Sequence, residues 1–322
     1  LFLITFWIAF EKFHLNWEFS WPWLNLGNVF SERIDWIQWY EYTGVFGGSL
    51  WVLSANFLLF NLLRKYSSFN DKRRFYIRII PRILLISIPI FISFLVKPNL
   101  NKGEEFKVLI TQPKIDPWES KYGTSKNNLD YFKIFKDLTN EELRANEYDF
   151  VFTPETYFSE GYGENLDYFG YTKLHDSLYN YLNQFQNTNL ISGIQFYKLY
   201  QNQKEKPTKS ANLVRDNIWV DYFNSSINIS ATKGFEYNHK TKLVVGSEYM
   251  PFKSFLEPII GTVMIDLGGT IRSMGTQHDS ERKLFNHSKK DLRTIPIVCY
   301  ETIDGEYVAN YVDLGANFIS II

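Results

Sequence analysis

Two long apolar stretches near the N-terminus set the first part of the chain apart from the rest. Residues 43–63 contain no charged side chain, and residues 79–96 are interrupted only by Arg82 and two prolines. An apolar helix of this length crosses the hydrocarbon core of a bilayer, and membrane helices tolerate proline. The pattern therefore predicts two membrane-spanning helices. The shorter apolar run at residues 1–10 is predicted to be the end of a third span.

Beyond Glu105 the apolar runs become short and alternate with amphipathic stretches. The short runs are rich in β-branched or aromatic residues and are bounded by Asn, Gly, Pro and Asp, which is typical of strands. Such runs predict strands at residues 106–112, 148–155, 188–197, 210–216, 227–235 and 294–301. Residues 128–143 and 171–186 carry apolar side chains at helical spacing and are predicted to be helices.

The end of the chain repeats this alternation, with a strand at residues 295–299, a helix at about 305–314 and a strand at 317–322. Strands that alternate with helices indicate an α/β fold in which helices cover the faces of a sheet. A chain of 322 residues is also long for one ordinary domain. We therefore predict a transmembrane helical region at residues 1–99 and an α/β domain at residues 100–322.

The distribution of Lys and Arg predicts the orientation of the spans. The segment between the two full spans, residues 64–78, contains six Lys and Arg, whereas residues 11–41 contain only Lys12 and Arg33. The positive-inside rule places the first segment in the cytoplasm, so the α/β domain is expected on the outer side of the membrane. Trp residues in the outer segment fit an interfacial aromatic belt; the alternative is an aromatic core patch. These residues are Trp17, Trp21, Trp23, Trp36 and Trp39.

The amino-acid composition argues against some classes of binding partner and cofactor. The chain has 34 Lys and Arg against 35 Asp and Glu and no long basic block, which argues against a nucleic-acid partner because phosphate binding needs clustered positive charge. A single cysteine allows no intramolecular disulfide. No His/Cys ligand cluster or nucleotide motif is present, so we expect no metal and no organic cofactor. The chain starts with Leu1 and stops inside an apolar run, so we expect sequence to be missing at both ends.

Cys299, the only cysteine, is a candidate nucleophile. It follows an apolar predicted strand and precedes a predicted helix. Backbone N–H groups at a helix N-terminus favour a thiolate, and a thiolate is the form of cysteine that attacks a carbonyl. The alternative is a buried, inert cysteine that packs as a small hydrophobic residue.

A cysteine nucleophile needs a base, which is usually a histidine. Of the five histidines, only His239 lies near other candidate residues. Glu155 directly follows a predicted strand and a proline, where a charged residue is unusual, and Lys240, Lys242 and Glu248 flank an apolar segment. The alternative is that both stretches are ordinary loops with solvated charges.

Taken in order, the segments PE, YxxKxxLVxxxE and CYE resemble the nitrilase superfamily, whose members use a Glu–Lys–Cys triad. A nitrilase domain that follows outward-facing membrane spans is similar to the apolipoprotein N-acyltransferase family. Residues 27–56 also resemble the outer loop and following span of that family. The resemblance runs over nearly the whole chain and implies an αββα nitrilase-like sandwich attached to transmembrane helices.

The resemblance implies a catalytic triad of general base, oxyanion-stabilising lysine and nucleophile at Glu155, Lys240 and Cys299. Lys240 is selected over Lys242 because the family lysine lies three residues before the leucine of the LV pair. In an apolar site, Glu155 would have a raised pKa suited to a base. The resemblance also implies supporting residues at Glu248, Tyr300 and Glu301. The family often has LVPFGE where this chain has LVVGSE, so the loop around Glu248 is expected to differ in shape.

The family activity transfers an acyl chain from a phospholipid, through a cysteine thioester, to the N-terminal amine of a diacylglyceryl-cysteine apolipoprotein. The resemblance therefore implies a multi-pass enzyme of the bacterial inner membrane with its catalytic domain on the periplasmic side, and we expect a monomer. Residues 250–269 are either an apolar arm that enters lipid or a partly buried loop. The rival functions are a membrane-anchored amidase that hydrolyses small amides and a non-catalytic membrane scaffold.

Overall fold

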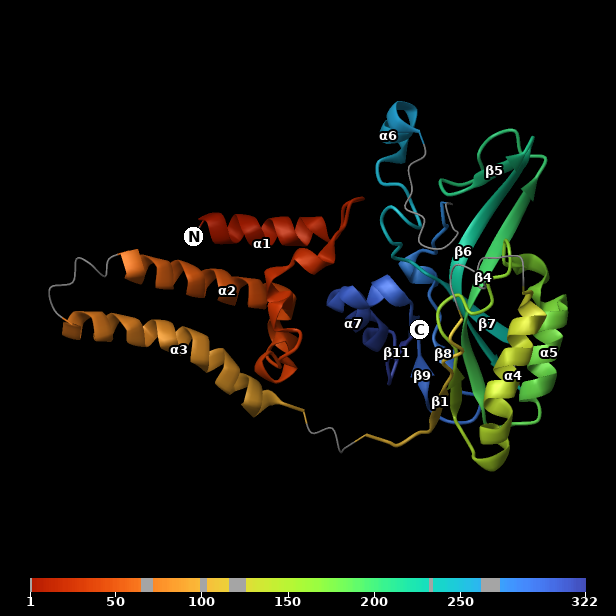
Figure 1. Cartoon of the computed structure of the whole chain (residues 1–322), viewed down its shortest axis with the longest axis horizontal. Coiled ribbons are helices and arrows are strands. Elements are labelled where there is room, and N and C mark those ends of the chain that lie inside the picture. The colour runs from red at the N-terminus through yellow and green to blue at the C-terminus, as the bar shows by residue number, and fades with distance from the viewer. Residues whose placement is uncertain (1, 65–71, 99–102, 116–125, 232–233, 262–272) are drawn as a thin grey trace. The chain divides into compact units, whose positions relative to one another are not determined.

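The computed structural model describes residues 2–64, 72–98, 103–115, 126–231, 234–261 and 273–322 (Figure 1). The chain divides into two compact units. The first contains Leu1–Glu104 together with Ile303–Glu306, and the second contains Glu105–Thr302 and Tyr307–Ile322. Each unit is described by itself below.

The first unit is helical. Its long helices are α1 (Phe2–His14), α2 (Tyr40–Arg64) and α3 (Lys72–Val96). Helices α2 and α3 contain the two predicted spans, and each is long and apolar enough to cross a membrane. The segment between α1 and α2 forms short 3₁₀ helices at Pro22–Leu24, Leu26–Phe30 and Ile34–Trp36.

Polar side chains fix this intervening segment against the long helices. The Glu11 carboxylate on α1 accepts hydrogen bonds from the Trp7 indole at 2.9 Å and from the backbone N–H of Leu26 at 2.8 Å. The Trp51 indole on α2 donates to the carbonyl of Leu85 on α3 at 2.8 Å. Such bonds link apolar helices without exposing backbone groups to lipid.

The second unit is built on a seven-stranded mixed sheet. Its central strands are β4 (Asn189–Gln201) and β6 (Ile218–Ser230), which pair antiparallel over their whole length. The parallel strands β1 (Val108–Ile110) and β2 (Phe150–Phe152) extend the sheet on the β4 side. The remaining strands are β3 (Glu164–Asn165), which pairs with β4, and β5 (Asn212–Arg215) and β7 (Phe235–His239), which both pair with β6.

Helices α4 (Asn128–Ala145) and α5 (Lys173–Leu182) lie side by side on one face of this sheet (Figure 1). Asn127 begins α4 with a capping box in which its side chain accepts from the backbone of Asp130 and the Asp130 side chain accepts in return. The apolar faces of both helices pack on alternate sheet residues, which form the largest core cluster of the unit. Its fully buried members include Phe135, Leu178, Leu190, Phe196 and Ile227.

The opposite face of the sheet is covered by two short strand pairs. Strand β8 (Phe285–Asn286) pairs with β9 (Arg293–Thr294), and β10 (Pro296–Ile297) pairs in parallel with β11 (Ser320–Ile321). A core cluster of Phe150, Phe152, Ile191, Phe285 and Leu292 joins this second layer to the main sheet. Helix α7 (Gly305–Asp313) places Tyr307 and Tyr311 against Ile295 and Ile297, so helices cover both outer faces. The predicted α/β sandwich is confirmed.

The predicted strand at residues 227–235 is wrong as a single element. It contains the end of β6 and the beginning of β7, which pair antiparallel as a hairpin, and residues 232–233 lie outside the described part of the chain. The first half of β6 was not predicted, because Asp221, Asn224 and Ser225 interrupt the apolar pattern of that segment. All three side chains are buried, so the polar positions inside β6 have structural or functional partners.

Candidate active site

Glu155 lies in the turn that follows β2. Thr156, the next residue, has a positive φ of 46°. The turn packs against Gly193 of β4 so closely that a Cβ at that position would lie 2.4 Å from the backbone nitrogen of Thr156 and 2.7 Å from the carbonyl carbon of Glu155. Only glycine permits this approach, which fixes the Glu155 backbone on the sheet.

Lys240 directly follows β7, and its side chain is only 1% exposed. Its backbone N–H donates to the carbonyl of Asn224 at 2.8 Å. Its ammonium group lies 3.1 Å from Glu155 Oε1 and 3.0 Å from Glu248 Oε1. Burial opposes the charge of the ammonium group, but the carboxylates of Glu248 and Glu155 outweigh burial and raise the pKa of Lys240. Lys240 is therefore a fixed cation.

Glu248 closes the loop that follows Lys240. Its Oε2 accepts from the backbone N–H of Val244 at 2.7 Å, while its Oε1 faces Lys240. Gly246 within this loop has a φ of 79°, a conformation that glycine adopts without strain. The structure thus brings Glu248 into contact with Lys240, in a loop to which its second oxygen is hydrogen-bonded.

Asn224 of β6 is a site residue that the sequence analysis missed. Its Nδ2 donates to Glu155 Oε1 at 2.6 Å and to Glu248 Oε1 at 3.1 Å, and its side chain is buried. The two carboxylates are therefore held by one ammonium and one amide. An asparagine inside a strand, where asparagine is disfavoured, was the signal that could have identified it.

Cys299 follows β10 and begins a short 3₁₀ helix, Cys299–Ile303. It has a positive φ of 48°, its backbone N–H donates to the carbonyl of Ile322 at 3.1 Å, and its side chain is exposed. A non-glycine residue with this φ is uncommon and occurs preferentially at functional sites. The sharp turn leaves the side chain accessible, although the thiol is partly surrounded by protein atoms.

The expectation that a helix N-terminus would favour the Cys299 thiolate is wrong. Partial burial and the negative charge of Glu155 raise the pKa of the thiol, whereas Lys240 lowers it and Glu248 raises it. The following α-helix begins only at Gly305, too far along the chain to stabilise a thiolate. The protonated thiol is thus the favoured form of Cys299.

The surroundings of Glu155 also differ from the apolar site that was expected. Its carboxylate contacts the Lys240 ammonium and the Asn224 amide, and its side chain is 27% exposed. The ammonium and the amide fix the position of the Glu155 carboxylate.

Glu301 connects the Cys299 turn to the Lys240 loop. Its Oε1 accepts from the Thr241 backbone N–H at 2.7 Å, from the Thr241 hydroxyl at 3.0 Å and from the Tyr307 hydroxyl at 2.6 Å. Its Oε2 accepts from the Val298 backbone N–H at 2.9 Å. Glu301 is buried and therefore acts as a structural connection between the residues that follow Lys240 and the residue that precedes Cys299. Tyr300 is also buried in the same turn.

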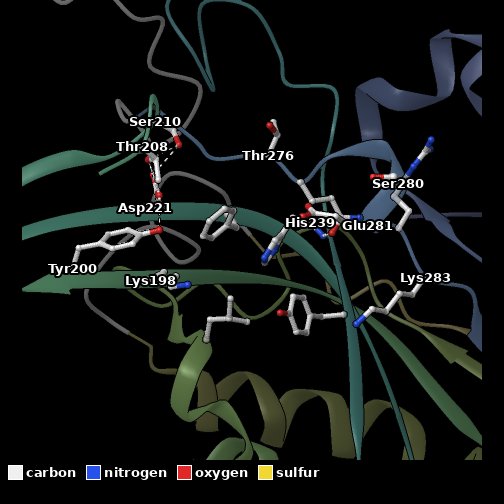
Figure 2. A pocket seen from close by; sticks show the side chains of 15 residues that line it. Lys198, Tyr200, Thr208, Ser210, Asp221, His239, Thr276, Ser280, Glu281 and Lys283 are labelled. Atoms are coloured by element: carbon white, nitrogen blue, oxygen red, sulfur yellow. Dashed lines mark hydrogen bonds between the residues drawn. The ribbon is translucent and has the colours of Figure 1, made fainter. Parts of the chain in front are cut away.

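His239 has no part in this network. Side chains alternate along a strand, so His239 projects from the sheet face opposite to Lys240. It lines a cleft of about 710 Å³ that also includes Lys198, Asp221 and Tyr237 and contains no predicted triad residue (Figure 2). Burial and the charge of Lys198 lower the pKa of His239 to about 3. Among the described residues, no histidine takes part in the hydrogen-bond and ion-pair network around Cys299.

The candidate apolar arm is described only in part. Residues 253–260 form helix α6 (Lys253–Ile260), on which Phe255 is 68% and Ile259 66% exposed. Residues 262–269 of the predicted arm lie outside the described residues. The described part exposes apolar side chains beyond the Glu248 loop.

Comparisons with known proteins add to this geometry. Residues 1–58 match the family model of the apolipoprotein N-acyltransferase N-terminal domain. The chain is 23% identical to the apolipoprotein N-acyltransferase of Chlorobaculum tepidum over 325 residues, which cover 98% of this chain and 57% of that protein. The chain is similar in sequence to an apolipoprotein N-acyltransferase. It spans little more than half of the length of this apolipoprotein N-acyltransferase.

Solved structures with a similar fold belong to other enzymes. A CN-hydrolase superfamily protein from Xanthomonas campestris is 14% identical, with 62% of this chain and 55% of that chain covered and a TM-score of 0.34. An amidase from Nesterenkonia sp. is 12% identical, with 68% of this chain and 65% of that chain covered and a TM-score of 0.38.

Proposed function

We propose that this protein transfers an acyl chain from a phospholipid to the N-terminal amine of a diacylglyceryl-cysteine apolipoprotein. The observation that carries the proposal is the network in which Glu155, Lys240 and Cys299 influence one another. Cys299 is the nucleophile, Glu155 the general base and acid, and Lys240 the cation for the oxyanion. The sequence similarity to an apolipoprotein N-acyltransferase supports the choice of reaction.

In the first half-reaction, Glu155 removes the proton from the Cys299 thiol, whose pKa the negative charge of Glu155 raises. The thiolate then attacks the ester carbonyl carbon of the phospholipid. The resulting oxyanion is stabilised by the Lys240 ammonium, and a preorganised donor of this kind contributes about 3 kcal/mol. When the intermediate collapses, the bond to the glycerol oxygen breaks and that oxygen takes the proton from Glu155. The products are a thioester on Cys299 and a lysophospholipid.

In the second half-reaction, the α-amine of the apolipoprotein attacks the thioester carbonyl. Glu155 accepts a proton from the amine as the new C–N bond forms, because it is again a carboxylate after the first half-reaction. Collapse of the second intermediate breaks the C–S bond and returns the proton to the Cys299 sulfur. The two lipid substrates thus bind to the same site one after the other, which predicts ping-pong kinetics.

The membrane placement belongs to the same proposal. Helices α2 and α3 would anchor the enzyme in the bacterial inner membrane, with the catalytic domain on the periplasmic side where both lipid substrates present their reactive groups. The charge difference between residues 64–78 and 11–41 supports this orientation. We propose a monomer, because a single chain supplies all three triad residues.

The test is detection of the acyl-enzyme. The full-length protein in nanodiscs is incubated with phosphatidylethanolamine, and Cys299 is analysed by peptide mass spectrometry for a hydroxylamine-labile acyl adduct. The adduct is expected in the unaltered protein and absent in Cys299→Ala and Glu155→Gln. A folded protein that forms no adduct but releases ammonia from small amides would contradict acyl transfer and establish the amidase. A folded protein with neither activity would favour the third alternative, a non-catalytic membrane scaffold.

A further inference from the structure

Two buried side-chain amides on the central strands of the sheet each have one atom without a hydrogen-bond partner among the described residues. Gln195 on β4 and Asn224 on β6 are directly opposite each other in the antiparallel ladder. Their exposed fractions are 1% and 2%. Gln195 Nε2, a donor, and Asn224 Oδ1, an acceptor, are both buried without a hydrogen-bond partner among the described residues. The two atoms are complementary.

The register brings these atoms within reach of each other. Directly opposite residues of an antiparallel pair project from the same face, with Cβ atoms about 4.5–5.5 Å apart. A glutamine side chain is long enough to span that separation after rotation about its own torsions. The structure shows no hydrogen bond between the two atoms, but a rotation of the Gln195 side chain would satisfy both at once, and buried polar atoms are nearly always hydrogen-bonded.

The orientation of the Asn224 amide matters to the site. Its nitrogen faces both Glu155 and Glu248, at 2.6 and 3.1 Å. If the amide turned over, its oxygen would face two carboxylates and repel both. A donor on Asn224 Oδ1 prevents that rotation, because Oδ1 would lose a buried hydrogen bond.

We propose that Gln195 is a positioning residue that donates to Asn224 Oδ1 and thereby keeps the Asn224 amide directed at Glu155 and Glu248. The inference extends the proposed function, since it assigns a further residue to the same site. Gln195 acts through Asn224, so its effect on the chemistry depends on Asn224 being present.

The experiment replaces Gln195 by methionine, which has a similar size and no donor. Loss of the fixed Asn224 donor leaves the negative charge of Glu155 less compensated, which raises the pKa of the Cys299 thiol further. Alkylation of Cys299 by iodoacetamide in the full-length protein is then expected to need higher pH. At a pH below the thiol pKa, alkylation of the Gln195→Met protein is expected to be roughly threefold slower than that of the unaltered protein. A rise of about half a unit in the thiol pKa has this effect. This reaction needs no lipid and so tests the inference independently of acyl transfer.

Two comparisons separate positioning from a structural effect. Ser226 lies two residues along β6 from Asn224, and its buried hydroxyl also has no described partner. Ser226→Ala is therefore the matched control and is expected to leave the alkylation profile unchanged. In an Asn224→Ala background, Gln195→Met is expected to cause no further shift, because residues that act as one unit are not additive.

The results separate the two proposals. An unchanged alkylation profile in folded Gln195→Met, or an equal shift with and without Asn224, overturns the role of Gln195, whatever the acyl-adduct experiment gives. Absence of the acyl adduct in the unaltered protein overturns the proposed function alone. If Gln195→Met does not fold, an experimental structure of the unaltered protein decides: a Gln195 Nε2 to Asn224 Oδ1 distance of about 2.7–3.2 Å supports the bond, and a water between them overturns it.

Discussion

At Cys299, two neighbouring charges act on the thiol in opposite directions. Partial burial and Glu155 favour the protonated form, and Lys240 favours the thiolate. The first two effects prevail, so the pKa of the thiol lies above its usual range. A thiol in this state reacts slowly on its own, and its reactivity depends on a base that removes the proton when a substrate is in place.

Glu155→Gln should make the Cys299 thiol more acidic and at the same time slow thioester formation. The glutamine has no negative charge, so the pKa of the Cys299 thiol falls and alkylation by iodoacetamide shifts to lower pH. Thioester formation with phospholipid should fall by about 10²-fold or more, because the general base is lost. The pH profile of alkylation measures the first effect and peptide mass spectrometry the second. A shift of alkylation to higher pH would contradict this account of the thiol.

Glu301 shows how a buried carboxylate can support a site without touching a substrate. It accepts hydrogen bonds from Thr241, Tyr307 and Val298, which belong to three different segments. Glutamine has the same shape, but an N–H₂ group replaces one of the two acceptor oxygens. That N–H₂ group would face the N–H or O–H donor that the oxygen accepted from, so the hydrogen bond would be lost.

Glu301→Gln is therefore expected to lower the free energy of unfolding by about 3 kcal/mol, as for other broken buried networks. Thioester formation should fall as well, because the Lys240 loop and the Cys299 turn lose their common partner. Thermal unfolding of the protein in detergent measures the first effect. Glu141→Gln, an exposed glutamate on α4 with no ion pair among the described residues, is the control and should leave the midpoint unchanged. Equal midpoints for Glu301→Gln and this control would contradict the connecting role.

The resemblance predicted a triad and three supporting residues, Glu248, Tyr300 and Glu301, but it did not predict Asn224. Glu155, Lys240 and Cys299 each stand in a short segment with an order typical of one family, and the structure brings the three side chains together. Asn224 was not identified because its role depends on which strand lies beside the Glu155 turn. Glu301 was identified by resemblance, but its partners come from loops whose proximity depends on tertiary structure.

At the scale of the element, the contact between the Glu155 turn and β4 positions the base. Gly193 lies in the middle of β4, where a glycine normally weakens a strand. Here it lets the backbone of the turn approach the strand directly. The length of β4 and β6 was underestimated from the sequence, since polar residues that serve the site and the cleft interrupt their apolar pattern.

Gly193→Ala should displace this turn. The added methyl group would lie within 2.7 Å of three backbone atoms in residues 154–156, so the backbone has to move. A shift of about 1 Å at a reacting group reduces the rate by up to about 10²-fold, and the same loss is expected in thioester formation. Gly170→Ala is the matched control, because its added Cβ would meet only the Phe235 ring at 3.4 Å. A Gly193→Ala protein with an unchanged acylation rate would show that the turn does not position the base.

At the scale of the whole molecule, a helical unit and an α/β unit are joined in one chain. The sequence predicted this division because the long uncharged runs and the short β-branched runs need different surroundings. The side of the membrane on which the α/β unit lies stays a prediction, since it rests on the distribution of Lys and Arg alone.

Cysteine labelling tests that orientation. In a Cys299→Ala background, Lys209→Cys places a thiol at an exposed position of the α/β unit, and Ser67→Cys places one between the two predicted spans. A membrane-impermeant maleimide is expected to label Lys209→Cys in spheroplasts and Ser67→Cys only after permeabilisation, as the positive-inside rule requires. The reverse pattern would place the catalytic domain in the cytoplasm and contradict the proposed substrates.

The enclosure of Lys240 by Glu155 and Glu248 also bears on the electrostatic balance of the proposed reaction. Two carboxylates and one ammonium carry one excess negative charge. In the proposed reaction that charge moves from Glu155 to the sulfur, then to the oxyanion and finally back to the carboxylate. The charge migrates around a stationary cation but its total never changes. An enzyme built this way can work beside lipid, where ions to neutralise a new charge are scarce, without recruiting any from solution.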